Sequence, residues 1–152
     1  NTDQDNDFKE KIDYLINTSF ELGKIKFNNI NYLKNSEAEM VKLFRNNFLA
    51  LKVSFCNEVA EFCKLKDINY ENVRQQAVKD QRIGGSHSQV PGHDGHCGYG
   101  GTCFPKDSKS LLYEMNKISM KSYIIQFMDE RNDNVDRKEA DWKNNKGRTV
   151  ID

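Results

Sequence analysis

Apolar residues recur at helical spacing near the N-terminus of the chain, in the segment FKEKIDYLINTSFELG. This spacing predicts a helix that begins near Phe8 and stops at Gly23. The next segment, residues 24–34, alternates imperfectly between apolar and polar side chains, and we expect a short strand there. The apolar residues that define the helix are Phe8, Ile12, Leu15, Ile16 and Phe20.

A long helix is predicted from Ser36 to about Lys64. Ser36 and Glu39 have the spacing of a capping box, in which each side chain accepts a backbone N–H at the other position. Apolar residues surround most of this helix, and such a helix is either buried centrally or shared with a second subunit. We therefore expect a homodimer that rests on it. These residues are Met40, Val41, Leu43, Phe44, Phe48, Leu49, Leu51, Val53, Phe55, Val59 and Phe62.

Shorter elements follow the long helix. Residues 69–80 are typical of a short helix, and residues 82–102 form a glycine-rich loop that holds most of the glycines and all of the histidines. A helix is predicted over residues 105–118, because Pro105 in a first turn sacrifices no intrahelical hydrogen bond. Cys103 is thus expected just ahead of a helix N-terminus.

The C-terminal part of the pattern predicts one more helical stretch, over residues 120–142, and the opening of a strand over residues 146–152. The expected fold class is mainly α. A long central dimerisation helix would pack against the other helices, with short strand remnants of flanking α/β domains at both ends.

Composition narrows the classes of partner. The 152 residues hold 23 basic and 23 acidic side chains, so no net charge draws the chain to nucleic acid or to an anionic membrane. No apolar run reaches the ~20 residues of a membrane span, and the first residues have no signal-peptide character. The four cysteines are therefore interpreted as free thiols in a reducing compartment, and the expected location is cytoplasmic.

The candidate chemistry lies in GYGGTCFPKD, residues 98–107, where glycines surround Cys103 and allow main chain to approach a ligand closely. The positive end of the following helix and Lys106 both favour a thiolate at this position. A thiolate suggests covalent catalysis on an electrophilic carbon. Cys56 and Cys63, seven residues apart on the long helix, are interpreted as buried core residues instead.

Two other kinds of site are weaker alternatives. The loop contains several metal-ligand types, which would suit a metal-binding regulatory domain, but their spacing is not that of a zinc knuckle. The segment GYGG also matches neither the Walker motif nor the GxGxxG dinucleotide motif. The residues of the metal alternative are His87, His93, His96, Cys97 and Cys103.

Three separated motifs then carry a resemblance. GYGGTCFPKD, preceded by DQRIG and by AEMVKLFRNNFLALKVSFCNE, resembles the nucleotide-sugar 6-dehydrogenases of the UDP-glucose/GDP-mannose dehydrogenase family. The resemblance covers residues 36–117 and extends more loosely to Asp152. It implies oxidation of a C6 alcohol to a carboxylate through two hydride transfers to NAD, with UDP-glucose as substrate and UDP-glucuronate as product. Relatives that act on GDP-mannose or UDP-N-acetylhexosamines share the cysteine motif and remain alternatives, as does a non-catalytic dimerisation module.

The resemblance also implies roles for single residues. Cys103 would capture the sugar aldehyde as a thiohemiacetal, which becomes a thioester. Lys42 and Asn46, four apart on one helix face, would bind the substrate and stabilise an oxyanion at C6. Asp107 would hold or activate the water, and Arg82 would reach across the dimer to the partner's nucleotide sugar. Without the motif, spacing favours a solvated polar stripe for Lys42 and Asn46. The corresponding alternatives are a helix-capping role for Asp107 and a surface salt bridge for Arg82.

The resemblance implies contacts for the loop as well. The segment that matches the family's substrate loop would line the sugar and the diphosphate, and Cys103, Phe104 and Lys106 would border the nicotinamide. Here SHSQVPGHDGHCG, residues 86–98, is longer and richer in histidine than in shorter family members. The expected substrate-loop residues are Asp94, Gly95, His96, Cys97, Gly98, Tyr99 and Gly100.

The domain organisation follows from the same resemblance. Residues 1–35 would be the end of an NAD-binding Rossmann domain, residues 36–143 the central helical domain with the catalytic cysteine, and residues 144–152 the start of a UDP-binding domain. The family's dinucleotide fingerprint and its catalytic glutamate have no match in these 152 residues. We therefore expect the chain to be part of a longer enzyme and to be inactive alone.

Overall fold

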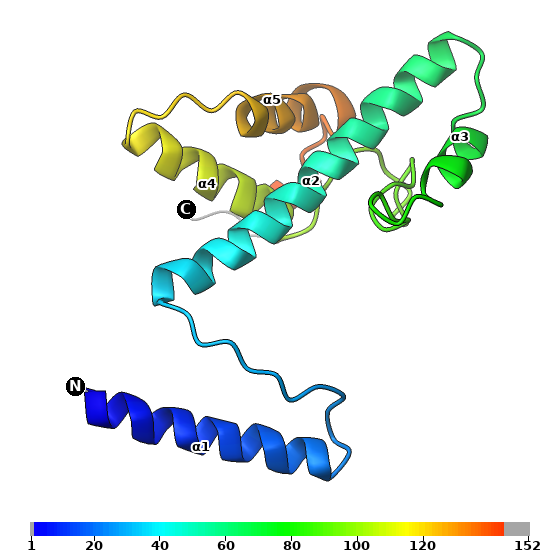
Figure 1. Cartoon of the computed structure of the whole chain (residues 1–152). Coiled ribbons are helices and arrows are strands. Elements are labelled where there is room, and N and C mark those ends of the chain that lie inside the picture. The colour runs from blue at the N-terminus through cyan, green and yellow to red at the C-terminus, as the bar shows by residue number, and fades with distance from the viewer. Residues whose placement is uncertain (1, 145–152) are drawn as a thin grey trace. The chain divides into compact units, whose positions relative to one another are not determined.

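The computed structural model describes residues 2–144 and shows only helices among them (Figure 1). The mainly α prediction is confirmed, and the described part contains no strand. Two short helical turns, η1 (Asn132–Asp136, π-helical) and η2 (Asp141–Asn144, 3₁₀), follow the last α-helix. The α-helices are α1 (Thr2–Glu21), α2 (Asn35–Leu65), α3 (Tyr70–Ala77), α4 (Phe104–Lys117) and α5 (Ile124–Arg131).

The chain forms two compact units, of which the first runs to Ala38. Its helix α1 ends as predicted, because Gly23 adopts a left-handed φ of 66° and its N–H closes back on the carbonyl of Phe20 at 2.9 Å. The strand predicted over residues 24–34 is wrong. Among residues 2–144 the segment finds no partner strand to complete a ladder, and it lies instead against α1, where the Tyr32 hydroxyl donates to Asp13 at 2.8 Å.

The start of α2 differs in detail from the prediction. The helix begins at Asn35, so Glu37 occupies its third position and accepts the backbone N–H of Lys34 at 2.9 Å. The predicted capping box between Ser36 and Glu39 is therefore wrong. Glu37 supplies the carboxylate half of such a box, but the Lys34 side chain has no acceptor for the reciprocal bond. The end of α2 at Leu65 lies one residue beyond the predicted one.

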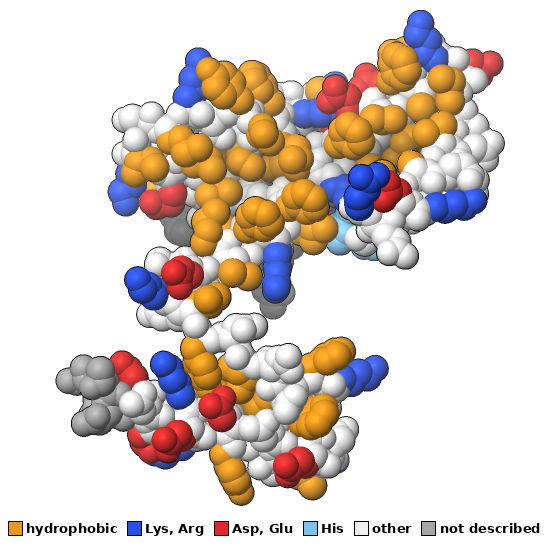
Figure 2. Space-filling model, in the orientation of Figure 1, with side chains coloured by type: hydrophobic (Ala, Val, Ile, Leu, Met, Phe, Trp, Pro, Cys, Tyr) orange, Lys and Arg blue, Asp and Glu red, His pale blue; other side chains and the backbone are white. Residues whose placement is uncertain are grey.

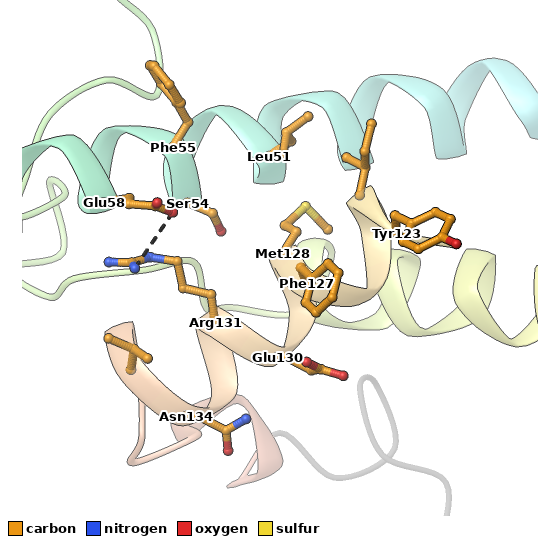
Figure 3. Close-up of a pocket in the computed structure, with 12 residues that line it drawn as sticks. Leu51, Ser54, Phe55, Glu58, Tyr123, Phe127, Met128, Glu130, Arg131 and Asn134 are labelled. Atoms are coloured by element: carbon orange, nitrogen blue, oxygen red, sulfur yellow. Dashed lines mark ion pairs between the residues drawn. The ribbon is translucent and has the colours of Figure 1, made fainter. Parts of the chain in front are cut away.

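The second unit, from Glu39 onward, is built on α2. Helix α4 packs against α5, and α5 and the glycine-rich loop meet α2 in a small core around Ala50, Tyr99 and Met128. Figure 3 shows Met128 on α5 pointing toward α2 beside Leu51, with Arg131 reaching toward Glu58. This core positions α4 and the loop that precedes it.

The two sides of α2 differ sharply in composition. The side that packs against the rest of the unit, here called the inner face, carries the small or polar residues Asn47, Ala50, Ser54 and Asn57, all buried. The outer face carries Phe44, Phe48, Phe55 and Phe62, whose exposed fractions are 55–65%. Figure 2 shows hydrophobic side chains gathered over α2 and the neighbouring helices. The apolar surround predicted from the sequence is therefore largely uncovered in the single chain.

The remaining elements agree with the prediction up to α4. Helix α3 and the irregular loop are confirmed, Cys56 and Cys63 are buried, and α4 begins at Phe104 with Pro105 in its first turn. The helical stretch predicted over residues 120–142 is broken instead. Only α5 is α-helical, and Arg137, with φ −139° and a buried side chain, ends the π turn that follows it.

The strand predicted over residues 146–152 lies outside the described residues. None of the helices in the described part combines the length and the apolar composition that crossing a bilayer requires.

Candidate active site

Cys103 lies at the N-cap of α4 and is exposed. It lines a hollow of about 540 Å³ together with Phe104, the glycine run 98–101 and the earlier loop residues 85–87. A slightly larger hollow of about 630 Å³ lies between α2 and α5 (Figure 3), but it contains none of the predicted site residues. The glycines beside Cys103 thus leave the sulfur open to a ligand, as the sequence suggested.

Asp107, one turn into α4, is the centre of a polar cluster against α2. Its side chain is 2% exposed, and Lys42 donates to Oδ1 at 2.9 Å while Asn46 donates to Oδ2 at 2.5 Å. Lys106 adds a third donor at 3.0 Å. Burial by itself raises the pKa of Asp107, but the hydrogen bonds from Lys42, Asn46 and Lys106 hold that pKa below its ordinary value. The carboxyl group is therefore ionised at neutral pH.

The same cluster acts on Lys106. The hydrogen bond to Asp107 raises the pKa of Lys106, and the nearby Cys103 adds to this effect. The structure thus brings the predicted residues Lys42, Asn46, Asp107 and Lys106 together next to the helix start that carries Cys103.

The predicted substrate loop divides into two groups. Asp94, Gly98, Tyr99 and Gly100 line the Cys103 hollow, whereas Gly95, His96 and Cys97 are not among the residues described as lining it. The ring of Tyr99 is 3% exposed and meets the Phe104 ring edge-on, with the centroids 6.2 Å apart. This contact ties the loop to the first residue of α4.

Gly95 and His96 are hydrogen-bonded to residues that do line the hollow: the N–H of His96 donates to Asp94 at 3.1 Å, and the N–H of Gly95 donates to the carbonyl of Gly92 at 2.9 Å. His96 Nδ1 lies 3.2 Å from a carboxylate oxygen of Glu139. Cys97 is exposed overall, but partial burial of its thiol and the nearby carboxylates of Asp136 and Glu139 raise the pKa of that thiol. Gly95 adopts a left-handed φ of 81° with open space beside it. None of these three residues lines the Cys103 hollow.

Arg82 lies outside the Cys103 hollow. Its guanidinium is paired with Asp80 at 2.6 Å, and its side chain is 89% exposed. It borders a third hollow, of about 340 Å³, together with Phe48 and Phe55 of the outer face. Within one chain Arg82 therefore makes the surface salt bridge that spacing alone allowed.

Sequence reasoning missed a second wall of the Cys103 hollow. His87 and His93 line it, and His87 holds a left-handed φ of 59° with its ring 5.6 Å from that of Phe104. Burial, Lys52 and His93 lower the pKa of His87, so its imidazole is neutral at neutral pH. The histidines were visible in the sequence only as metal-ligand types, and across residues 2–144 no group of three or more potential ligands is placed to hold a metal.

Sequence reasoning also missed the side chains that support the loop. Asn57 on the inner face of α2 accepts the N–H of Gly98 at 3.2 Å, and Asn132 and Arg137 contact the loop from the η1 segment. The one available signal was Asn57, a polar residue at a buried position of the long helix. Asn132 and Arg137 lie 33 and 43 residues from their loop partners and left no local signal.

Comparison with known proteins relates the part of the chain that carries this site to one family. Residues 36–134 match the UDP-glucose/GDP-mannose dehydrogenase family, central domain. The chain is 42% identical over 85 residues to a UDP-glucose 6-dehydrogenase of Pseudomonas aeruginosa, a match covering 56% of this chain and 18% of the relative. It is 36% identical over 104 residues to a UDP-glucose 6-dehydrogenase of Rhizobium meliloti, covering 68% and 21%.

A third relative is the UDP-glucose 6-dehydrogenase TuaD of Bacillus subtilis, 32% identical over 108 residues, with 68% of this chain and 22% of the relative covered. The chain thus spans about a fifth of the length of the curated relatives it matches. The family match covers more than half of the chain, including α2, the loop and α4. The chain belongs to the UDP-glucose/GDP-mannose dehydrogenase family, whose central domain residues 36–134 match.

Proposed function

We propose that this chain supplies the central, cysteine-bearing part of an NAD-dependent dehydrogenase that oxidises C6 of UDP-glucose to give UDP-glucuronate. The observation that carries the proposal is the exposed Cys103 on a hollow of about 540 Å³, one turn from the buried carboxylate of Asp107. The names of the three relatives support UDP-glucose as the substrate.

In the proposed chemistry, the sulfur of Cys103 bonds to C6 of the sugar aldehyde, and the thiol proton ends on the aldehyde oxygen. Loss of a hydride and a proton from this thiohemiacetal leaves a thioester. Water then attacks the thioester carbon, the C–S bond breaks, and the products are the free thiol and the carboxylic acid. Hydrolysis of the thioester thus returns Cys103 to its free thiol.

We propose that Lys42 and Asn46 stabilise negative charge on the C6 oxygen. Both donate to Asp107, which fixes their positions, yet an ammonium has three N–H groups and an amide has two. Each side chain therefore keeps a donor for an oxyanion. Asp107, ionised in this cluster, is the proposed acceptor of a proton from the attacking water.

NAD, when bound, accepts the hydrides that leave C6. The residues present fit one border of a nicotinamide, because the Phe104 ring lines the same hollow as Cys103 and offers an aromatic wall. We propose that Lys106 lies at the same border, and that residues 1–35 and 144–152 belong to the flanking NAD-binding and UDP-binding domains. The activity is accordingly proposed for the longer enzyme and not for these 152 residues alone.

The outer face of α2 supports a homodimer in the proposed enzyme. Phe44, Phe48, Phe55 and Phe62 form an exposed aromatic row, and a row of this kind is stabilised by contact with another apolar surface. Arg82 borders a hollow with two of these phenylalanines, so a partner that covers the row would meet its guanidinium. This placement supports the proposed contact of Arg82 with the partner's nucleotide sugar.

The test is to give the full-length enzyme UDP-glucose, GDP-mannose and a UDP-N-acetylhexosamine in turn, with NAD, and to follow NADH by absorbance. Two NADH per UDP-glucose, and slower oxidation of the other sugars, is the expected result. If another nucleotide sugar is oxidised faster, that sugar is the substrate and the proposal of UDP-glucose is wrong. No NADH with any of them would favour a non-catalytic dimerisation module.

A further inference from the structure

The segment from Asn132 to Asp141 holds the glycine-rich loop from one side. Asn132 is fully buried, its Oδ1 accepts the backbone N–H of Tyr99 at 2.8 Å, and its amide donates to the backbone carbonyl of Tyr99 at 3.1 Å. The side chain thus pairs with both backbone groups of one loop residue, as a neighbouring strand would. This pairing fixes the loop at the point where it enters the Cys103 hollow.

Arg137 makes a second attachment a few residues further on. Its side chain is 3% exposed, and it donates to Asp94 at 2.8 Å while both oxygens of Asp141 accept from it at 2.8 Å. The hydrogen bonds to Asp141, only partly opposed by burial, raise the pKa of Arg137. A planar guanidinium with five N–H donors suits this three-point attachment, which a lysine does not reproduce.

The loop lies directly on these two side chains. A Cβ added at Gly100 would approach Nε and Nη2 of Arg137 to 2.7 Å, and one added at Gly98 would approach Oδ1 of Asn132 to 2.6 Å. Both distances are too short for real side chains. Gly98 and Gly100 are therefore required by the packing beneath them as well as by access to Cys103.

The π turn of η1 explains how one segment supplies both attachments. The N–H of Arg137 donates to the carbonyl of Asn132, five residues back, at 2.8 Å. This wide turn places Asn132 and Arg137 together beneath Gly98. Single π turns of this kind occur frequently at functional sites.

We propose that Arg137 and Asn132 are positioning residues for nucleotide-sugar binding, which they control by fixing the backbone of residues 98–100 beside Cys103. The proposal rests on the proposed function, because it takes the hollow as the sugar site. Neither residue is among those lining the hollow, so each acts through the loop. A glycine run has no side chains to hold itself in place, and misplacement of a binding backbone by about 1 Å weakens binding strongly.

The first test is Arg137→Lys in the full-length enzyme, with Arg131→Lys as its matched control. Arg131 is also partly buried and paired with Asp136 at 3.1 Å and Glu61 at 2.9 Å, but its described contacts include no loop residue. The measurement is the concentration of UDP-glucose that protects Cys103 against alkylation by iodoacetamide. For Arg137→Lys we expect this concentration and KM to rise at least about tenfold, a loss of ~1.4 kcal/mol of binding. For Arg131→Lys we expect less than about a twofold change.

A positioning role predicts that the alkylation rate of Cys103 without substrate stays near the wild-type rate in Arg137→Lys, and that kcat changes less than KM. A purely structural role would instead change the alkylation rate and kcat as well. Protection at the wild-type concentration would overturn the proposal. If UDP-glucose does not protect the wild-type enzyme, the proposed function fails, and that failure is visible before any variant is made.

A second variant covers the case in which Arg137→Lys does not fold. Gly100→Ala keeps the guanidinium and displaces the backbone above it, since the added methyl group has no room. The same rise in the protecting concentration is expected, and Gly101→Ala, with nothing within 4 Å of the added carbon, reports the cost of its left-handed φ alone. Equal protection in Gly100→Ala and in the wild type would contradict the positioning role.

Discussion

The two faces of α2 reverse the usual order of a helix on a soluble protein. The inner face buries amide and hydroxyl side chains, and the outer face exposes a row of phenylalanines. Each inner asparagine holds a different segment, since Asn47 donates to the backbone carbonyl of Asp107 at 3.2 Å and Asn57 accepts the N–H of Gly98 at 3.2 Å. The inner face therefore holds the two segments that flank Cys103.

This difference between the two faces separates the residues that hold the candidate site from the residues that are exposed on the surface of the single chain. Soluble helices normally turn their apolar stripe inward and their polar side outward. In α2 the polar side contacts the segments around Cys103, and the aromatic row of the outer face is exposed in the single chain. The predictions below separate these two roles, in order of decreasing effect.

The largest effect is expected on the inner face, from Asp107→Asn in the full-length enzyme. The change leaves Lys42 and Lys106 without their shared carboxylate and removes the proposed proton acceptor. We expect kcat to fall by about 10³-fold, within the range for loss of a general base. Asp133→Asn, which removes a carboxylate paired with Lys109 away from the Cys103 hollow, serves as the control. NADH formation measures both, and a kcat above half of the wild-type value in Asp107→Asn would remove this role.

On the outer face, Phe48→Ser should weaken self-association of the full-length enzyme. Phe48 is 58% exposed and lies in the aromatic row, where it stacks against Phe44 with ring centroids 6.4 Å apart. A central aromatic residue of an interface contributes about 2 kcal/mol or more, so the dimer Kd should rise about 30-fold. Sedimentation across a concentration series measures this. Tyr113→Ser, at an exposed position of α4 and outside the row, should leave the Kd unchanged.

If the wild-type protein sediments only as a monomer at high micromolar concentration, the outer face is not a dimer interface.

A smaller effect is expected in the pH dependence of stability. The folded-state pKa of Asp107 is depressed, so its contribution to stability is present above its unfolded pKa of about 3.9 and is lost as the pH falls through the lower folded value. The melting temperature of Asp107→Asn should therefore lie several degrees below that of the wild type at pH 7. This difference should shrink below about pH 4, and a difference that stays constant down to pH 2 would contradict the ionised cluster.

The smallest effect on stability is expected from Arg82→Ala. Its guanidinium is almost fully exposed and pairs only with Asp80 in the described contacts, so the melting temperature should stay within about 1 °C of the wild-type value. Calorimetry of the full-length enzyme checks this. A drop of several degrees would mean that Arg82 stabilises the folded enzyme and does more than border the outer face.

Much of the helical framework follows from local sequence patterns. The bounds predicted for α2 agree with the structure to within one residue at each end, although the capping box used for the start was wrong, and Pro105 correctly placed the start of α4 directly after Cys103. The strand over residues 24–34 was predicted wrongly, because alternation indicates an extended segment but does not reveal whether a partner strand exists. Local pattern was therefore sufficient for the bounds of α2 and the start of α4, whereas α1 begins at Thr2, six residues before its predicted start near Phe8.

The side chains that hold the glycine-rich loop could not be predicted, because their contacts are distant in the sequence. Asn132 and Arg137 contact residues 33 and 43 positions away, and no local spacing signals such contacts, whereas Asn57 was visible only as a polar residue at a buried helix position. The break of the predicted helix at Arg137 has the same origin, since a buried guanidinium facing the loop overrides helical propensity. Resemblance to a family supplied the candidate site residues, while the structure supplied the side chains that hold the loop beside Cys103.

The most direct test of the covalent mechanism is to stop the full-length enzyme during turnover with acid, in the presence of UDP-glucose and NAD, and to map its peptides by mass spectrometry. We expect a UDP-glucuronyl thioester on the peptide that contains Cys103, and neither adduct nor acid in Cys103→Ser. An adduct on another residue, or full production of UDP-glucuronate by Cys103→Ser, would contradict this mechanism.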